Sequence, residues 1–239
     1  FNAIIGANAA GKSNFIKIFE FLRDICTDGL ENAISIQGGT NYLRNITLGK
    51  GKDLKIQIVI EHDKMMIELP SRKDNAHILI NATESEYRFS LRFHKRGTGF
   101  KVIDDSVRIK CDKYDNKGKE RIGSGDVCAQ LKNNKYEINI SSGLNLEEND
   151  LIPAFIRKRK IGNKSVLLEN PYILFPLWFK IFDKIAIYDF DPRLSKKSTP
   201  IVGRAELEEN GSNLALVLER IIKNKEDKEK LANLLKDIL

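Results

Sequence analysis

Gly6-Ala7-Asn8-Ala9-Ala10-Gly11-Lys12-Ser13 is the stretch that decides the fold, and it directly follows the apolar run Phe1–Ile5. It fits the pattern G-x-x-x-x-G-K-[ST], which lies between a strand and a helix and binds phosphate groups. Glycines let successive backbone N–H groups curl round phosphate oxygens, and the start of the next helix adds the positive end of its dipole. The sequence therefore predicts a nucleoside triphosphate site, with the following residues around the phosphates: Gly6, Asn8, Ala9, Ala10, Gly11, Lys12, Ser13 and Asn14.

Two side chains of this loop have separate expected roles. Lys12 is placed to reach the β- and γ-phosphates, and the Ser13 hydroxyl is the expected ligand of Mg²⁺. A helix should follow, because apolar residues recur at helical spacing and predict one buried face. That face comprises Phe15, Ile18, Phe19, Leu22, Ile25 and Cys26.

Composition indicates a water-soluble protein with a substantial core. The chain has 239 residues, of which 41% are hydrophobic, and no run approaches the roughly 18 apolar residues that a membrane span needs. We therefore expect no membrane partner. The three cysteines are scattered without a C-x-x-C pair, which favours a reducing compartment, the cytoplasm, and argues against structural zinc.

The charge balance leaves an acidic partner open. The formal net charge is +7, a modest excess that is compatible with DNA binding. The densest basic run can neutralise several phosphates of DNA, or it can be a solvated helix end stabilised by the dipole. That run is Arg157, Lys158, Arg159 and Lys160.

The middle of the chain alternates between apolar and polar residues, which predicts short antiparallel strands separated by polar turns. The expected strands are 54–61, 65–69, 78–81, 87–93, 100–103, 107–111 and 136–140. Residues 62–64 and 95–99 are the expected hairpin turns, and the polar segment 112–126 is the expected mobile loop. A doubly wound enzyme would instead alternate strands and helices from the phosphate loop onwards.

The last third is expected to be mostly helical. The pattern predicts helices over 150–160 and 171–182, a strand over 185–188 that ends at Asp189, and two final helices. The first of these follows the caps Asn210-Gly211-Ser212, with Leu214, Val217, Leu218, Ile221 and Ile222 inward. The second covers about 226–239 and buries Leu231, Leu234, Leu235 and Ile238.

The predicted fold class is α/β with α+β character, a P-loop NTPase. Its expected parts are 1–45 (strand, phosphate loop, helix and turn), 46–143 (antiparallel subdomain) and 144–239 (mostly helical, with one strand near 185–189).

Asn8 and Asn14 make the first motif resemble the RecF/SMC branch of ABC-type ATPases. Residues 188–194 (YDFDPRL) and 210–218 (NGSNLALVL) are similar to the RecF-like "predicted ATPases", relatives of OLD-type and phage-defence ATPases. Ala9 departs from the glycine that most ABC-type loops have at its position. The resemblance implies an ABC-like first lobe that binds ATP and Mg²⁺, with two heads of a homodimer enclosing the nucleotide, in DNA repair or phage defence. It also makes Arg44 a candidate DNA contact, because SMC-like heads carry an arginine after their first helices.

The resemblance covers only part of that family's head. No serine–glycine signature, acidic Walker B pair or switch histidine is recognisable here. We expect this chain to be the N-terminal portion of a longer protein, a first lobe whose own C-terminal partner lobe is missing. The complete protein is expected to hydrolyse ATP, and this lobe alone to bind nucleotide weakly and to turn it over slowly or not at all.

Asp189 is the one acidic candidate for a catalytic site. It ends a strand of Walker B form and can be a Mg²⁺-linked acid, but Phe190 stands where the base glutamate is expected, so a structural strand is the alternative. Two fragments also imitate GTPase motifs: Asp115-Asn116-Lys117-Gly118 and Asn224-Lys225-Glu226-Asp227. Two other functions therefore stay open: a nucleic-acid-binding or assembly module with a structural nucleotide, and a self-contained P-loop kinase or GTPase.

Overall fold

The computed structural model describes residues 4–43, 52–70, 77–94, 97–151, 161–170, 182, 185–194 and 206–236. The chain divides into two compact units, Phe1–Ile185 and Ala186–Leu239. The first unit contains helices α1 (Lys12–Asp28), α2 (Leu30–Ile36), α3 (Thr40–Leu43) and α4 (Glu148–Leu151), and the short 3₁₀ helices η1 (Ser142–Leu144) and η2 (Leu167–Glu169). Its strands are β1 (Leu54–Pro70), β2 (His77–Phe93), β3 (Phe100–Tyr114), β4 (Arg121–Lys132) and β5 (Lys135–Ile140).

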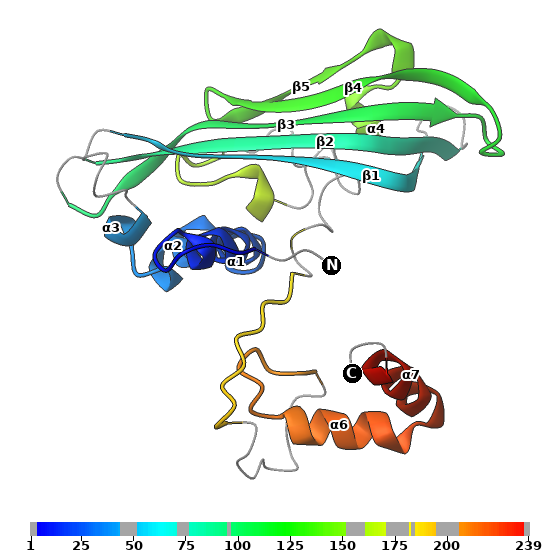
Figure 1. Ribbon diagram of the computed structural model, residues 1–239. Helices are drawn as coiled ribbons and strands as arrows, with labels where there is room; N and C mark the ends of the chain where they lie inside the picture. The colour runs from blue at the N-terminus through cyan, green and yellow to red at the C-terminus, as the bar shows by residue number, and fades with distance from the viewer. Residues whose placement is uncertain are drawn as a thin grey trace. The chain divides into compact units, whose positions relative to one another are not determined.

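The five strands form one antiparallel meander in the order β1-β2-β3-β4-β5 (Figure 1). The expected antiparallel sheet is thus confirmed, but the strands are longer and fewer than predicted. Predicted strands 54–61 and 65–69 are the single strand β1, and the expected hairpin at 62–64 is wrong. Those residues lie in a bulge between Glu61 and Met65, which absorbs extra residues without reversing the chain. Two further pairs of predicted strands likewise merge into β2 and β3.

The predicted mobile loop 112–126 is also wrong. It comprises the end of β3, a tight turn and the start of β4, a strand that the sequence pattern did not reveal. The Asp115 carboxylate closes the turn by accepting hydrogen bonds from the backbone N–H of Lys119 (2.7 Å) and of Glu120 (3.2 Å). These bonds lower the pKa of Asp115. The polar residues and glycines of β4 have low strand propensity, so the sequence pattern did not indicate a strand. The strand forms because it pairs with β3.

Glycines in β4 let η1 lie directly against the sheet. A Cβ on Gly123 would stand 2.2 Å from the Gly143 carbonyl oxygen, a distance that no real side chain tolerates. Ser141 reinforces this contact, because its hydroxyl accepts a hydrogen bond from the Asp126 N–H (2.9 Å) and its own N–H donates to the Asp126 carbonyl (2.9 Å). The absence of a side chain at position 123 is therefore a packing requirement.

We expect Gly123→Ala to lower the free energy of unfolding by about 2 kcal/mol, because the added methyl must push two backbone segments apart. Gly162→Ala is the matched control, since nothing lies within 4 Å of a Cβ built there. Urea unfolding of the two variants measures the difference. Equal stability of the two variants would contradict the close approach of η1 and β4.

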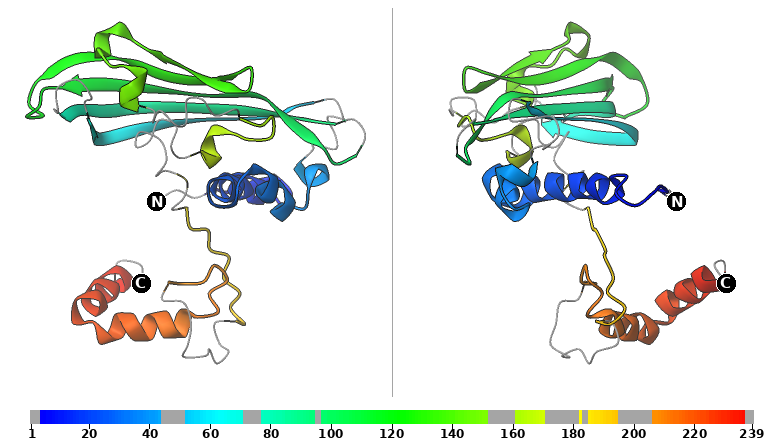
Figure 2. Two further views of the ribbon diagram at one scale, coloured as in Figure 1. Left: turned by 180° about the vertical axis from the view of Figure 1, so that it is seen from behind. Right: turned by 60° about the vertical axis from the view of Figure 1, so that its left-hand side comes forward.

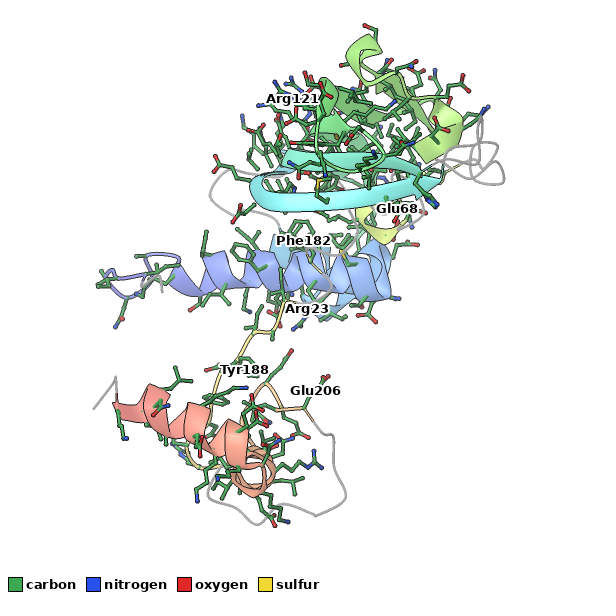
Figure 3. The ribbon with its side chains drawn as sticks, turned by 90° about the vertical axis from the view of Figure 1, so that its right-hand side faces the viewer. Arg23, Glu68, Arg121, Phe182, Tyr188 and Glu206 are labelled. Atoms are coloured by element: carbon green, nitrogen blue, oxygen red, sulfur yellow. The ribbon has the colours of Figure 1, made fainter. Side chains whose placement is uncertain are left out.

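The core lies between one face of the sheet and helices α1 and α2, which run beneath it in Figure 1. Alternate residues of the long strands point into this core: Tyr87, Phe89 and Leu91 of β2, for example, are fully buried. Figure 3 shows Phe182 between α1 and the sheet, and Arg121 on the sheet's other side. We call the face away from α1 the outer face.

On the outer face, positive and negative side chains of neighbouring strands lie side by side, an arrangement that we call the chequerboard. Cross-strand ion pairs join β2, β3 and β4, and each is partly exposed, so each contributes little to stability by itself. They are Arg88–Asp104 (3.3 Å), Lys110–Glu84 (2.8 Å), Arg108–Asp126 (2.8 Å) and Arg121–Asp112 (3.3 Å).

One buried polar cluster interrupts the apolar core. Asp105 of β3 is fully buried, and its Oδ2 accepts hydrogen bonds from the Tyr136 hydroxyl and from the Leu167 backbone N–H (2.7 Å). Burial, the largest cause, raises the pKa of Asp105 to about 7, although the hydrogen bonds from Tyr136, Tyr87 and Leu167 act in the opposite direction. The cluster joins β2, β3 and β5 to the segment that contains η2.

The second unit contains α6 (Leu214–Lys223) and α7 (Lys225–Lys236), which confirm the two predicted final helices as far as residue 236. The burial predicted for α7 is wrong at Leu234 and Leu235, which are 61% and 48% exposed. Leu231 is partly buried, and Ile238 lies outside the described residues. On α6, Leu214, Val217, Leu218 and Ile221 are partly buried as expected, but Ile222 is exposed. Apolar periodicity identified both helices, yet it did not reveal how much of each face the unit covers.

The strand expected over 185–188 is wrong as well. These residues form no strand, and the next ones make only isolated hydrogen bonds, from the Asp189 N–H to the Glu209 carbonyl (2.9 Å) and from Asp191 to Asn210 (3.1 Å). A strand needs a continuous ladder, which two bonds do not supply. Most of the helices expected over 150–160 and 171–182 lies outside the described residues. Figure 2 gives two further views of both units.

Candidate nucleotide-binding site

The candidate site is the loop of residues 6–11 together with the first turn of α1. Gly11 immediately precedes the helix with φ 91° and ψ 9°, a left-handed conformation that favours glycine. The loop folds on itself, since the Ala10 N–H donates to the Ala7 carbonyl (3.2 Å), and the first bond of the helix runs from the Phe15 N–H to the Gly11 carbonyl (3.0 Å). Gly11 and the helix start thus lie as the pattern predicts.

The strand expected before the loop is wrong where the structure describes it. Ile4 and Ile5 form no strand and are 54% and 92% exposed, while residues 1–3 lie outside the described part. The apolar sequence has β propensity, but an extended segment becomes a strand only beside a partner. The sheet β1–β5 gives these two residues no partner.

Lys12 is folded back over the loop. Its Nζ donates hydrogen bonds to the carbonyl oxygens of Gly6 (2.8 Å) and Ala7 (2.7 Å). The ammonium group is therefore held beside the loop backbone, at a position from which it can exchange these carbonyls for phosphate oxygens. A positive charge is fixed next to the amides that would hold the same phosphates.

The N-terminus of α1 is suited to an anion. No side chain caps it, and its first turn contains no acidic residue. The first amides of a helix lack intrahelical partners and carry the positive end of the dipole, so they bind phosphate well. Ser13 and Asn14 are exposed in this turn, and the Ser13 hydroxyl has the chemistry of a Mg²⁺ ligand. The residues present fit a triphosphate with its magnesium ion.

Ala9 stands where most ABC-type loops have glycine, and its backbone conformation is unfavourable for alanine. Its φ is 63°, which is left-handed for a residue with a Cβ and costs about 1 kcal/mol. We expect Ala9→Gly to raise the free energy of unfolding by up to about 1 kcal/mol, because glycine adopts this conformation without that cost. Ala10→Gly is the control, since Ala10 does not have a positive φ. Urea unfolding of both variants makes the comparison, and a gain for Ala10→Gly alone would contradict the expectation.

The buried face predicted for α1 is only partly confirmed. Leu22 and Ile25 are buried and Cys26 is partly buried, but Phe15, Ile18 and Phe19 are 48%, 42% and 36% exposed. The rings of Phe15 and Phe19 pack on each other edge to face, with centroids 5.2 Å apart. The helix is thus covered at its C-terminal half and has an apolar surface beside the loop.

The other sequence candidates belong to other parts of the chain. Asp189 belongs to the second unit, where its side chain is exposed. Arg44 and the basic run Arg157, Lys158, Arg159 and Lys160 lie outside the described residues. The two GTPase-like fragments have structural roles: Asp115 closes the β3–β4 turn, and the Asn224 side chain caps α7 by accepting from the Glu226 N–H (3.0 Å).

No cluster of metal-ligating side chains occurs among the residues that the structure describes. Two of the histidines have structural partners: His62 Nε2 lies 2.8 Å from Ser85 Oγ, and His77 Nδ1 lies 2.9 Å from Glu68 Oε1. Burial lowers the pKa of His62. Within the same described ranges, no helix is long and apolar enough to cross a membrane.

Sequence reasoning missed the residues that attach α1 to the rest of the unit. Glu169 is the main one: its Oε2 accepts a hydrogen bond from the Leu30 N–H (2.7 Å), 139 positions away in sequence. A single glutamate after the apolar residues 166–168 gives no local signal of such a contact. The hint is Gly29, which directly precedes α2 and lets the carboxylate approach, since a Cβ there would lie 3.0 Å from Glu169 Oε2.

Comparison with known families gives a match over the first part of the chain. A family model described as "AAA domain, putative AbiEii toxin, Type IV TA system" matches residues 1–129, which cover the phosphate loop, α1 and most of the antiparallel sheet. No protein with a curated description and no solved structure matches the chain.

Proposed function

We propose a function for this chain from its family and from the geometry of the loop. The chain belongs to the family described as "AAA domain, putative AbiEii toxin, Type IV TA system". It is therefore a nucleotide-binding ATPase of the P-loop type. The observation that carries the proposal is the uncapped start of α1 with Lys12 Nζ beside it. The nucleotide that we propose is ATP with Mg²⁺.

The proposed binding follows from the chemistry of the loop. The backbone amides from Asn8 to Asn14 donate to phosphate oxygens, and Lys12 neutralises the β- and γ-phosphates. Ser13 contributes its hydroxyl to the coordination of Mg²⁺. When bound, the ion supplies charge neutralisation between the β- and γ-phosphates. Gly6 and Gly11 allow the backbone to approach the ligand closely.

The finer proposal is a head of the RecF/SMC type. Two copies of the complete protein would enclose ATP between them, so that the nucleotide favours dimerisation, in the service of phage defence or DNA repair. A second lobe would cover the apolar surface beside the loop, formed by Ile4, Ile5, Phe15, Ile16, Ile18 and Phe19. Large exposed apolar side chains of this kind are a feature of protein interfaces, and this supports the proposal. In this arrangement the phosphate loop holds the nucleotide, and the partner lobe completes the hydrolytic site.

Titration calorimetry with MgATP and MgGTP, together with a phosphate-release assay, tests the proposal. We expect saturable MgATP binding and slow phosphate release by the chain alone. A clear preference for GTP would favour a GTPase, and brisk turnover by the isolated chain would contradict the need for a partner lobe. Affinity for duplex DNA that falls steeply with salt and ignores nucleotide would favour an assembly module with a structural nucleotide.

A further inference from the structure

The phosphate loop precedes the exposed end of α1, and only the other end of this helix is buried in the first unit. The buried residues of α1 are Phe21, Leu22, Asp24 and Ile25, all in its second half. The helix has 17 residues and is thus about 25 Å long at about 1.5 Å per residue. A tilt of about 10° at the buried end moves the loop by about 4 Å. Whatever fixes the buried end therefore also fixes where the loop holds its phosphates relative to the sheet.

Glu169 fixes that end from the side of η2. Its Oε2 accepts from the Leu30 N–H (2.7 Å), which begins α2 directly after the α1–α2 junction at Gly29. Its Oε1 accepts from the Val166 N–H (2.9 Å), so one carboxylate joins the junction to the segment before η2. Gly29 completes the contact, because its N–H donates to the Ile25 carbonyl (3.1 Å) and its missing side chain leaves room for the carboxylate.

The segment 161–170, which carries Glu169, is bound to the sheet at three places. The Ile161 N–H donates to the Asn134 carbonyl (2.8 Å), the Val102 N–H donates to the Asn163 carbonyl (2.7 Å), and the Leu167 N–H donates to Asp105. Lys164 adds an exposed link to α2, because its Nζ lies 2.6 Å from Glu31 Oε1. The sheet, segment 161–170 and the α1–α2 junction are thus connected by directed hydrogen bonds.

We infer that Glu169 is a positioning residue for the nucleotide site: it sets the tilt of α1, and with it the place of the phosphate loop relative to the rest of the first unit. This inference rests on the proposed binding of ATP at the loop. Contacts within the loop, which hold phosphates, travel with the helix and do not depend on the tilt. Contacts to the nucleoside from outside the loop depend on it.

This distinction gives a measurement that a merely structural role would not affect. Glu169→Gln keeps the size of the side chain but presents an N–H donor to one of the two backbone N–H groups. We expect the variant to bind MgATP about fivefold more weakly and to bind magnesium tripolyphosphate with an affinity within twofold of the unmodified chain. Glu137→Gln is the matched control, because Glu137 is an exposed carboxylate on β5 that pairs only with Lys132 at 2.9 Å among the described contacts.

Circular dichroism and thermal unfolding show whether the variant is folded at the assay temperature. If it is not, Lys164→Gln removes the exposed contact with Glu31 beside the same junction. We then expect MgATP binding to weaken about twofold and the binding of magnesium tripolyphosphate to be unaffected. Unchanged MgATP affinity in a folded Glu169→Gln chain overturns the inference, and so does equal weakening of both ligands. Absence of binding by the unmodified chain to either ligand instead overturns the proposed function, so the two failures differ.

Discussion

Replacing Lys12 with alanine is expected to weaken MgATP binding by about 100-fold or more. The reason is the loss of two charge-assisted hydrogen bonds to the β- and γ-phosphates, each worth roughly 1.5–3 kcal/mol, when about 1.4 kcal/mol corresponds to tenfold in affinity. Titration calorimetry at one ionic strength measures the effect. The fold should tolerate the change, because the hydrogen bonds described for Lys12 are to exposed carbonyls of its own loop.

Lys17→Ala is the matched control for this experiment. Lys17 is an exposed lysine of α1, little more than one turn beyond Lys12, so its loss changes the net charge equally but removes no phosphate contact. We expect its MgATP affinity to stay within about twofold, because exposed charges at such a distance are screened by salt. Equal losses in the two variants would show that the lysine acts through general electrostatic attraction and not through the loop.

The second large expected effect concerns the buried carboxyl of Asp105. Its pKa in the folded chain is about 7, raised by burial from a usual 3.8. The folded state therefore binds this proton more tightly than the unfolded state does. The resulting stabilisation is complete below pH 3.8 and is lost as the pH rises through 7. Between pH 5 and pH 8 the loss is expected to be about 2–3 kcal/mol.

Asp105→Asn should remove this dependence. Asparagine has no titrating proton, and its carbonyl oxygen can still accept from the Leu167 N–H and the Tyr136 hydroxyl. Urea unfolding at pH 5 and pH 8 measures the loss for each chain, and the difference between the chains isolates Asp105 from other groups. The control is Asp104→Asn, because Asp104 is the adjacent carboxylate, faces outward and pairs with Arg88 at 3.3 Å. Parallel pH profiles for Asp105→Asn and the unmodified chain would refute a shifted Asp105.

The sequence was informative where one residue type satisfies a local need. Gly11 has the positive φ that favours glycine, and the helix begins at Lys12, so the spacing alone predicted the loop and α1. Alternation along residues 54–61 and 87–93 predicted antiparallel strands, and apolar periodicity predicted the two final helices. The caps expected at 210–212 are wrong, because α6 follows Asn213 without a side-chain cap. Each of these signals acts within a few residues.

The rest depends on partners that are distant in sequence. Residues 62–64 have the composition of a turn, yet pairing with β2 keeps them inside one strand as a bulge. Ile4–Ile5 and 185–188 have the composition of strands, but the described residues supply no ladder for either. The contact of Glu169 with Leu30 and the burial of Asp105 also arise only from tertiary packing. These features could not be predicted, because each is decided by what lies next to the residue in space.

The chequerboard on the outer face has a consequence for DNA. A protein gains most of its affinity for DNA when its cations displace the counterions that are condensed on the phosphates. Arg88, Lys110, Arg108 and Arg121 already lie beside carboxylates of neighbouring strands. A duplex laid on this face would have to compete with those carboxylates, and it would meet their repulsion as it approached. At these four positions the outer face therefore offers DNA little uncompensated positive charge, even though the chain as a whole carries a net charge of +7.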